Sequence, residues 1–194
     1  MSWTNNIENL NAVLLHLSVR DRAGKEVEPD SAFLSWKNLT LRARENRKTV
    51  YLIGNGASAS MASHIAADLA KNARVRTEVF TDLSLITAVG NDLSYEDVFA
   101  EPLRIKMTEG DMLIAISSSG QSPNVIKAIQ EATRLGGLVI TLSAMKRNNT
   151  LQSQGILNFY VPAESYGMAE TSHAAILHYW VDQMVATKTE NTTS

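Results

Sequence analysis

The sequence contains no cysteine, so disulfide bonds, thiolate catalysis and cysteine-ligated zinc are all excluded. It also has no run of about 18 consecutive apolar residues, which excludes a transmembrane helix. Neither sign of charge dominates, because 18 basic and 20 acidic side chains leave a formal net charge of −2. A chain with this balance has no global electrostatic reason to bind nucleic acid. Any anionic ligand must therefore be held by local geometry.

The first residues lack the basic and apolar segments of a signal peptide, so we expect a cytoplasmic protein with no membrane partner. The 194 residues are 44% hydrophobic and 20% charged, which is typical of one globular domain. We expect N-terminal helices over residues 1–47, an α/β core over residues 48–186 and a flexible polar tail over residues 187–194.

Two helices are predicted before the core. Apolar residues at helical spacing predict the first over residues 3–18, and the charged stretch over residues 20–28 is predicted to be a loop. The second helix is predicted to begin at a cap, Asp30 or Ser31, and to end near Asn46. Its apolar anchors are Phe33, Leu34, Trp36 and Leu41. These helices can pack on the domain or on another subunit, and we expect the tryptophans to be packing residues.

The core alternates between strands and helices. Three short apolar runs end in glycine or serine and predict buried strands: Thr49–Ile53, Met112–Ile116 and Leu138–Leu142. Weaker strand candidates are Thr77–Phe80 and Asn158–Val161, and helices are predicted over Ser58–Lys71, Pro123–Leu135 and Ala169–Ala186. Continuous apolar strands alternating with helices favour an α/β fold with a parallel sheet covered on both faces. Such a sheet binds ligands at the carboxyl ends of its strands.

Two loops at these strand ends are suited to an anion. The first is Gly54-Asn55-Gly56-Ala57-Ser58, where glycine permits a sharp turn before a helix N-terminus with free N–H groups. The second runs from Ser117 to Asn124 and places four hydroxyls around Gly120. Hydroxyls and helix-start amides can bind phosphate without a lysine. Ordinary strand-to-helix turns are the alternative, although four serines exceed what one cap requires.

Two of the predicted helices carry titratable groups. His64 and Asp68 share a helix face, and Glu170 and His178 lie two turns apart on roughly one side of the last predicted helix. His173 points in another direction. If the two helices meet, two imidazoles and two carboxylates form a plausible zinc-binding set. Solvated side chains unrelated to any site are the alternative.

Several of these segments together resemble the sugar isomerase (SIS) domain and, within it, the phosphoheptose isomerase family. The resemblance is carried by Gly54–Ser58, by His64 and Asp68, by Val89–Asp92 and by Ile116–Ala128. It implies a three-layer αβα sandwich, a homotetramer and active sites that draw on more than one subunit. The implied reaction is the aldose–ketose isomerisation of sedoheptulose 7-phosphate through an enediol.

The resemblance also assigns roles to residues. Asp68 and His178 are the implied acid–base pair, and the implied zinc ligands are His64, Asp68, Glu170 and His178. The implied substrate-binding residues are Asn55, Gly56, Ser58, Asn91, Asp92, Ser117, Ser118, Ser119 and Ser122.

This chain departs from the family pattern where the family has glutamate and glutamine, because it has Asp68 and Glu170. Met168 also replaces a basic residue, and Ala57 replaces a second glycine. Two alternatives therefore stay open. One is an isomerase of a different phosphosugar. The other is a non-catalytic SIS-domain protein that senses a sugar phosphate or bridges partners.

Overall fold

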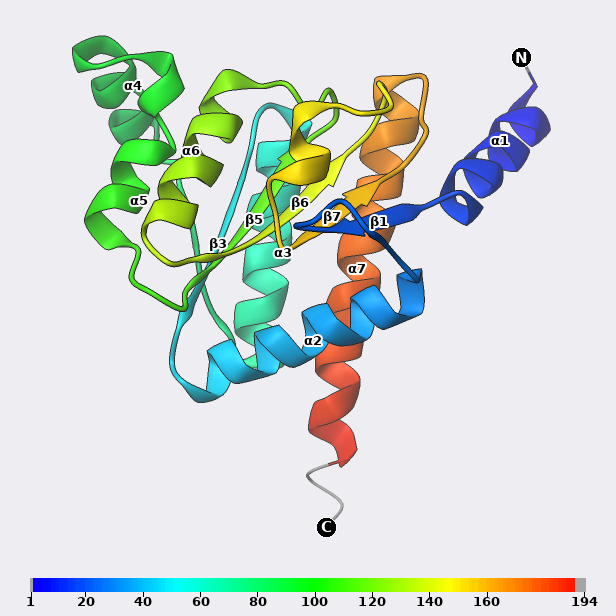
Figure 1. Ribbon diagram of the computed structural model, residues 1–194, viewed down its shortest axis with the longest axis horizontal. Helices are drawn as coiled ribbons and strands as arrows, with labels where there is room; N and C mark the ends of the chain where they lie inside the picture. Colours follow the sequence, from blue (N-terminus) through cyan, green and yellow to red (C-terminus); the bar gives the residue numbers. More distant parts are fainter. Residues whose placement is uncertain (1, 191–194) are drawn as a thin grey trace.

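A computed structural model describes the backbone of residues 2–190 and the side chains of residues 2–186 (Figure 1). The helices are α1 (Trp3–Leu15), α2 (Pro29–Glu45), α3 (Ala57–Ala73), α4 (Leu83–Asp92), α5 (Ala100–Lys106), α6 (Pro123–Arg134) and α7 (Tyr166–Glu190), with 3-10 turns η1 (Tyr95–Asp97) and η2 (Thr150–Ser153). The strands are β1 (Ser18–Asp21), β2 (Glu26–Val27), β3 (Thr49–Gly54), β4 (Arg76–Val79), β5 (Met112–Ser117), β6 (Leu138–Ser143) and β7 (Leu157–Tyr160).

The strands of the described chain form one sheet in the order β2-β1-β7-β6-β5-β3-β4. Strands β3 to β7 are parallel to one another, whereas β1 runs antiparallel to both β2 and β7. The predicted α/β fold with a parallel sheet is confirmed, and an antiparallel pair extends it at one edge.

Two apolar cores cover the two faces of the sheet. Along β3, Val50 and Leu52 contribute to one core, and Tyr51 and Ile53 contribute to the other. Residues of α2, α3 and α7 line the first core, and residues of α4, α5 and α6 line the second. The result is a helix–sheet–helix sandwich, in which successive side chains of a strand point to opposite faces (Figure 1).

Each of the five strands predicted in the core is present, and so are the three helices predicted there. Two further helices, α4 and α5, lie between β4 and β5 in a segment for which no element was predicted. Of the residues in α4, only Val89 is buried, so its apolar pattern has no single buried stripe.

The prediction for residues 16–28 was wrong. Helix α1 ends at Leu15, and the segment predicted as a loop forms the β1–β2 hairpin. Gly24, at φ +79°, makes the turn, and the Asp21 carboxylate accepts hydrogen bonds from the backbone of Ala23 and Lys25 at 2.9 Å. The pairing of β1 with β7 stabilises this hairpin, and no local pattern reveals a partner so distant in the chain.

The cap of helix α2 lies two or three residues earlier than predicted. Glu28 is the N-cap residue, and its carboxylate accepts a hydrogen bond from the backbone N–H of Ser31 at 2.9 Å. The predicted anchors Phe33 and Trp36 are buried, but Leu34 is 58% exposed and is not an anchor. Leu34 follows Phe33 directly, so it lies about 100° further around the helix and outside the buried face.

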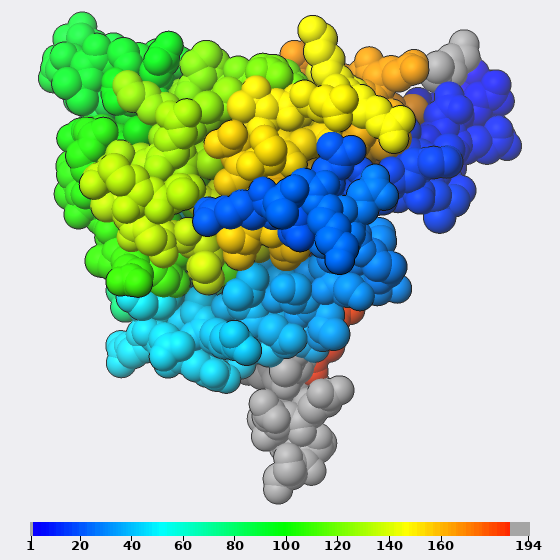
Figure 2. Space-filling view, viewed as in Figure 1, coloured from blue at the N-terminus to red at the C-terminus, as the bar shows by residue number. Residues whose placement is uncertain are grey.

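Helix α1 contains no buried residue and projects from one corner of the molecule (Figure 2). Trp3 is 76% exposed, so it is not a packing residue within this chain. The other two tryptophans do pack: Trp36 and Trp180 stack with ring centroids 4.2 Å apart and join α2 to α7.

Helix α7 continues to Glu190, past the predicted end at Ala186. The rest of the predicted tail, residues 191–194, lies outside the described residues. Across residues 2–190, no helix combines the length and the apolar character needed to cross a membrane.

Candidate active site

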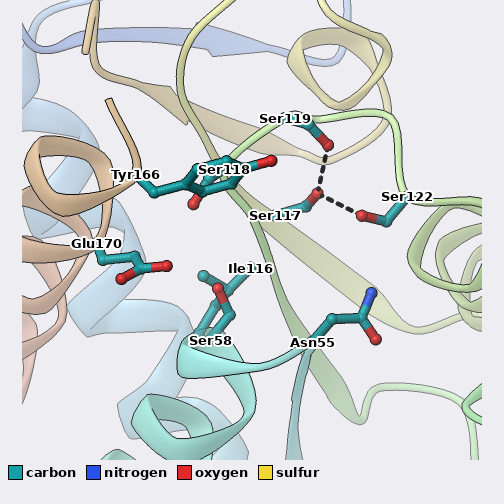
Figure 3. Close-up of a pocket in the computed structure, with 9 residues that line it drawn as sticks. All are labelled: Asn55, Ser58, Ile116, Ser117, Ser118, Ser119, Ser122, Tyr166 and Glu170. Carbon is teal, nitrogen blue, oxygen red and sulfur yellow. Dashed lines mark hydrogen bonds between the residues drawn. The ribbon is translucent and has the colours of Figure 1, made fainter. Parts of the chain in front are cut away.

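A pocket of about 170 Å³ lies at the carboxyl ends of β3 and β5, where the parallel sheet predicted a ligand site (Figure 3). Its walls come from the β3–α3 loop, from the loop after β5, and from the start of α7. It is lined by Asn55, Ser58, Ile116, Ser117, Ser118, Ser119, Ser122, Tyr166 and Glu170. We call it the serine pocket.

Glycine allows the first loop to close on the sheet. A Cβ atom at Gly54 would lie 2.6 Å from the Ser58 Cβ and 3.0 Å from the Ile116 carbonyl oxygen. Gly56 adopts φ +56° and is the N-cap residue of α3. These two glycines bring the first turn of α3, with Ser58, to the pocket; Gly56 itself does not line it.

The serine loop after β5 is held by its own hydroxyls, and the Asn149 side chain packs against it at Gly120. The Ser117 hydroxyl lies 3.0 Å from that of Ser122 and 3.5 Å from that of Ser119. Gly120 adopts φ +62°, and a Cβ atom there would lie 2.1 Å from the Asn149 Oδ1. The loop therefore follows one defined path around the pocket.

Several polar groups in the serine pocket have no partner. Among the described residues, the hydroxyls of Ser58, Ser118 and Tyr166 and the carboxylate of Glu170 make no hydrogen bond. Ser58 and Ser118 are only 5% and 7% exposed, so their hydroxyls have little access to water outside the pocket. Buried polar groups are normally paired, so the two buried serine hydroxyls in particular are available to a ligand.

Helix ends add to this polarity. No side chain of the N-cap residues of α3 and α6, Gly56 and Ser122, accepts a hydrogen bond from the first backbone N–H groups of those helices. The positive ends of two helix dipoles thus lie at the serine pocket without a cap from those residues. None of the residues that line the pocket is basic. Neutral donors and helix ends can together hold an anion here.

Asn55 is oriented by two residues that the sequence did not single out as site residues. Its amide exchanges two hydrogen bonds with the amide of the buried Asn124, at 2.9 and 3.0 Å. The Tyr95 hydroxyl donates a further hydrogen bond to the Asn55 Oδ1 at 3.3 Å. Asn124 belongs to the serine-loop motif, but no sequence pattern connects it to Asn55. The predicted Asn91 and Asp92 do not line the pocket; they are exposed, and their side chains contact each other at 2.8 Å.

Helices α3 and α7 bring three of the four predicted metal ligands together. One ligand atom each from His64, Asp68 and His178 lies within 4.8 Å of the others. The His64 Nε2 is 3.4 Å from the Asp68 Oδ2, and the two imidazole rings are 5.3 Å apart between centroids. Two nitrogen ligands and one carboxylate fit a zinc ion that keeps an open coordination position. These residues therefore form a group that can bind a metal.

Glu170, the fourth predicted ligand, is not part of this group. It lines the serine pocket from the first turns of α7, two helical turns before His178. Ser58 and His64 are six residues apart on α3, so the pocket and the His64–Asp68–His178 group are about 9 Å apart along that axis. The same pair of helices thus carries a polar pocket and a group of titratable side chains.

His173 lies between Glu170 and His178 in sequence but points into the core, where its exposure is 0%. Burial lowers the pKa of its imidazole to about 4. Neither ring nitrogen reaches a partner at normal hydrogen-bond geometry among the described residues, although the nearby Ser143 backbone opposes the lowering. His173 is therefore neutral in the folded protein near neutral pH.

This neutral histidine makes stability depend on pH. In the unfolded chain, the imidazole binds a proton below about pH 6.5, whereas the folded chain binds it only near pH 4. The unfolded state therefore gains protons first as the pH falls, and the folded state loses stability between those values. We expect His173 to lower the free energy of unfolding by about 2 kcal/mol between pH 7 and pH 5.

Urea unfolding at both pH values measures this loss. His173→Gln should remove the pH-dependent part, whereas His16→Gln, at the exposed end of α1, should keep it. The same pH dependence in His173→Gln and the unaltered protein would show that another group is responsible.

The fold and the site together define a class of protein. A family described as SIS domain matches residues 27–144, from just before α2 to just after β6. The chain is an SIS-domain protein.

Within that class, the chain belongs to the phosphoheptose isomerase family. The phosphoheptose isomerase of Campylobacter concisus is 35% identical over 142 residues, which cover 69% of this chain and 74% of that protein. The solved phosphoheptose isomerase from Francisella tularensis is 25% identical with a TM-score of 0.79, covering 95% of this chain and 98% of that one. The enzyme from Neisseria gonorrhoeae is 28% identical with a TM-score of 0.73, covering 79% and 86%.

Proposed function

We propose that this protein isomerises a phosphorylated sugar between its ketose and aldose forms, converting sedoheptulose 7-phosphate to D-glycero-D-manno-heptose 7-phosphate. One observation carries the proposal. Helices α3 and α7 place the group of His64, Asp68 and His178 a short way along the same helix pair from the serine pocket. A sugar phosphate has two matching ends, because its carbon chain carries an anion at one end and a carbonyl group toward the other.

The phosphate end would occupy the serine pocket. Its oxygens would accept hydrogen bonds from Ser58, Ser117, Ser118, Ser119 and Ser122, and the α3 dipole would favour the negative charge. Asn55 would contact a sugar hydroxyl, in the orientation fixed by Asn124.

The carbonyl end would lie at Asp68 and His178. Isomerisation through an enediol needs one group that removes a carbon-bound proton and another that returns it, and these two residues would share the transfers. A zinc ion held by His64, Asp68 and His178 would polarise the substrate oxygens. Glu170 would become a fourth ligand only by leaving its place at the serine pocket.

We also propose a cytoplasmic homotetramer with active sites shared between subunits. The exposed apolar residues of α1, Trp3, Ile7 and Leu15, have no partner core within the described chain, so a second copy would cover them. Asn91 and Asp92, which lie outside the pocket of their own chain, would then serve a neighbouring site.

Product analysis tests the proposal directly. Purified protein is incubated with sedoheptulose 7-phosphate, with and without a chelator, and the heptose 7-phosphates are separated. Formation of the aldose supports the proposal, and loss of that activity on chelation supports a bound metal.

The Glu170 carboxylate beside the serines favours a second candidate, an isomerase of another phosphosugar. Turnover of a different sugar in a panel would select that candidate, and binding without turnover of any sugar would indicate a sensor.

Ser118→Ala is expected to raise KM by about tenfold or more, because the phosphate loses one charge-assisted hydrogen bond. Ser118 is suited to this test because its hydroxyl makes no hydrogen bond within the described protein, so the substitution breaks no internal contact. Steady-state kinetics measure the change, and Ser35→Ala, on the exposed face of α2, is the matched control. An unchanged KM would place the phosphate elsewhere.

A further inference from the structure

Tyr166 is the first residue of α7 and lines the serine pocket with Glu170, one helical turn further along. Its backbone is fixed by Ser165, whose hydroxyl accepts a hydrogen bond from the N–H of Met168 at 3.3 Å and whose carbonyl accepts one from Ala169 at 3.0 Å. Figure 3 shows the Tyr166 side chain directed across the pocket toward the serine loop. The start of α7 therefore aims the phenol at the place that an anion would occupy.

The phenol has no partner in the described protein. Its hydroxyl makes no hydrogen bond, and its ring packs against no other aromatic ring among the described residues. The side chain is 63% exposed. Tyr51, by contrast, is buried, and its hydroxyl donates to the Lys106 carbonyl. Among the described residues, no hydrogen bond and no ring contact gives Tyr166 a structural role.

The charges around the pocket favour a neutral hydrogen-bond donor such as the Tyr166 phenol. None of the lining residues is basic, and the carboxylate of Glu170 faces the same cavity. A phosphate group there meets a like charge, and every neutral donor in reach then contributes to holding it. The Tyr166 hydroxyl is such a donor, on the part of the pocket wall that α7 supplies.

We infer that Tyr166 is a further substrate-binding residue, whose hydroxyl donates a hydrogen bond to the phosphate group from the α7 side of the serine pocket. The inference rests on the proposed function for the identity of the sugar, but it concerns only the phosphate. Tyr166 takes no part in proton transfer, so it acts on binding and leaves the chemical step unchanged.

The test compares Tyr166→Phe with the unaltered protein in two measurements. One is steady-state isomerisation of sedoheptulose 7-phosphate, and the other is calorimetric titration with inorganic phosphate. Because only the hydroxyl is lost, we expect KM to rise about tenfold, kcat to stay within about twofold and phosphate affinity to fall by a similar factor to KM. Tyr166→Ala should weaken both at least as much.

Tyr179→Phe is the matched control. It removes the same hydroxyl on the same helix, but Tyr179 packs edge-on against Phe33, with ring centroids 4.8 Å apart, and lies outside the serine pocket. Both measurements should be unchanged in this variant. A KM and a phosphate affinity in Tyr166→Phe within about twofold of the unaltered protein would overturn the inference.

The two measurements separate this inference from the proposed function. If the unaltered protein binds inorganic phosphate but turns over no heptose, the proposed function fails. A loss of phosphate affinity in Tyr166→Phe would then still support the role of Tyr166, and an unchanged affinity would still overturn it.

Discussion

Asp68→Asn and His178→Ala are each expected to lower kcat for the isomerisation of sedoheptulose 7-phosphate by about 10²–10⁴-fold, the usual contribution of one positioned acid or base. Asparagine keeps the shape of the aspartate but can neither accept a proton nor supply an anionic ligand. Alanine removes the imidazole that stands next to His64. Both side chains lie at the surface side of their helices rather than in the core, so the fold should survive each change.

Each variant has a control of the same chemistry. Asp182→Asn changes an exposed carboxylate further along α7, and His16→Ala changes an exposed imidazole at the end of α1. Both controls should retain full activity. Turnover at the unaltered rate in Asp68→Asn or His178→Ala would remove that residue from the mechanism. A metal analysis of the same proteins would show whether the loss of activity accompanies loss of the ion.

Gly120→Ala is expected to destabilise the protein by about 2–5 kcal/mol, from a left-handed backbone and from overpacking. The new Cβ would lie 2.1 Å from the Asn149 Oδ1. Asn149 cannot easily retreat, because its amide donates to the carbonyls of Ala144 and Lys146 at 3.1 and 3.0 Å. The serine loop must therefore shift, and KM should rise by about tenfold or more as its hydroxyls leave the phosphate.

Gly24→Ala separates the effect of backbone strain from the effect of overpacking. Gly24 has φ +79°, but no atom lies within 4 Å of where its Cβ would be, and it sits in the β1–β2 turn away from the site. It should cost only the backbone strain of about 1–2 kcal/mol and leave KM unchanged. Urea unfolding and kinetics of both variants measure the difference. Equal destabilisation in the two would show that Asn149 moves aside without cost.

The strands of the core were predictable because they are buried on both faces. β3, β5 and β6 read as continuous apolar runs, and each ends in the small polar residues of a loop. The hairpin of β1 and β2 was not predictable, because β1 is short and its register with β7, Ser18 opposite Tyr160, joins distant parts of the chain. A strand whose main partner is that distant leaves no local signal.

Some parts of the candidate site were likewise predictable from the sequence, and others were not. The serine loop and the Gly54–Ser58 turn can be recognised from a few neighbouring residues. A sharp turn needs glycine, and an anion needs closely spaced donors. Tyr166 had no such signal, since one aromatic residue at a helix start has many possible surroundings. Glu170 was predicted as a metal ligand beside His178 on the last helix, and the structure places its side chain at the serine pocket.

The sequence alone thus determined the alternation of strands and helices, the positions of the two polar loops and the helices α3 and α7 that carry titratable groups. These properties depend on neighbours within a few residues, through backbone geometry and helical periodicity. Only the tertiary structure decided that His64 stands beside His178 and that Ser58 shares a pocket with Glu170. The physical reason is that the rotation and offset of two packed helices follow from their whole shared interface and from the sheet beneath them.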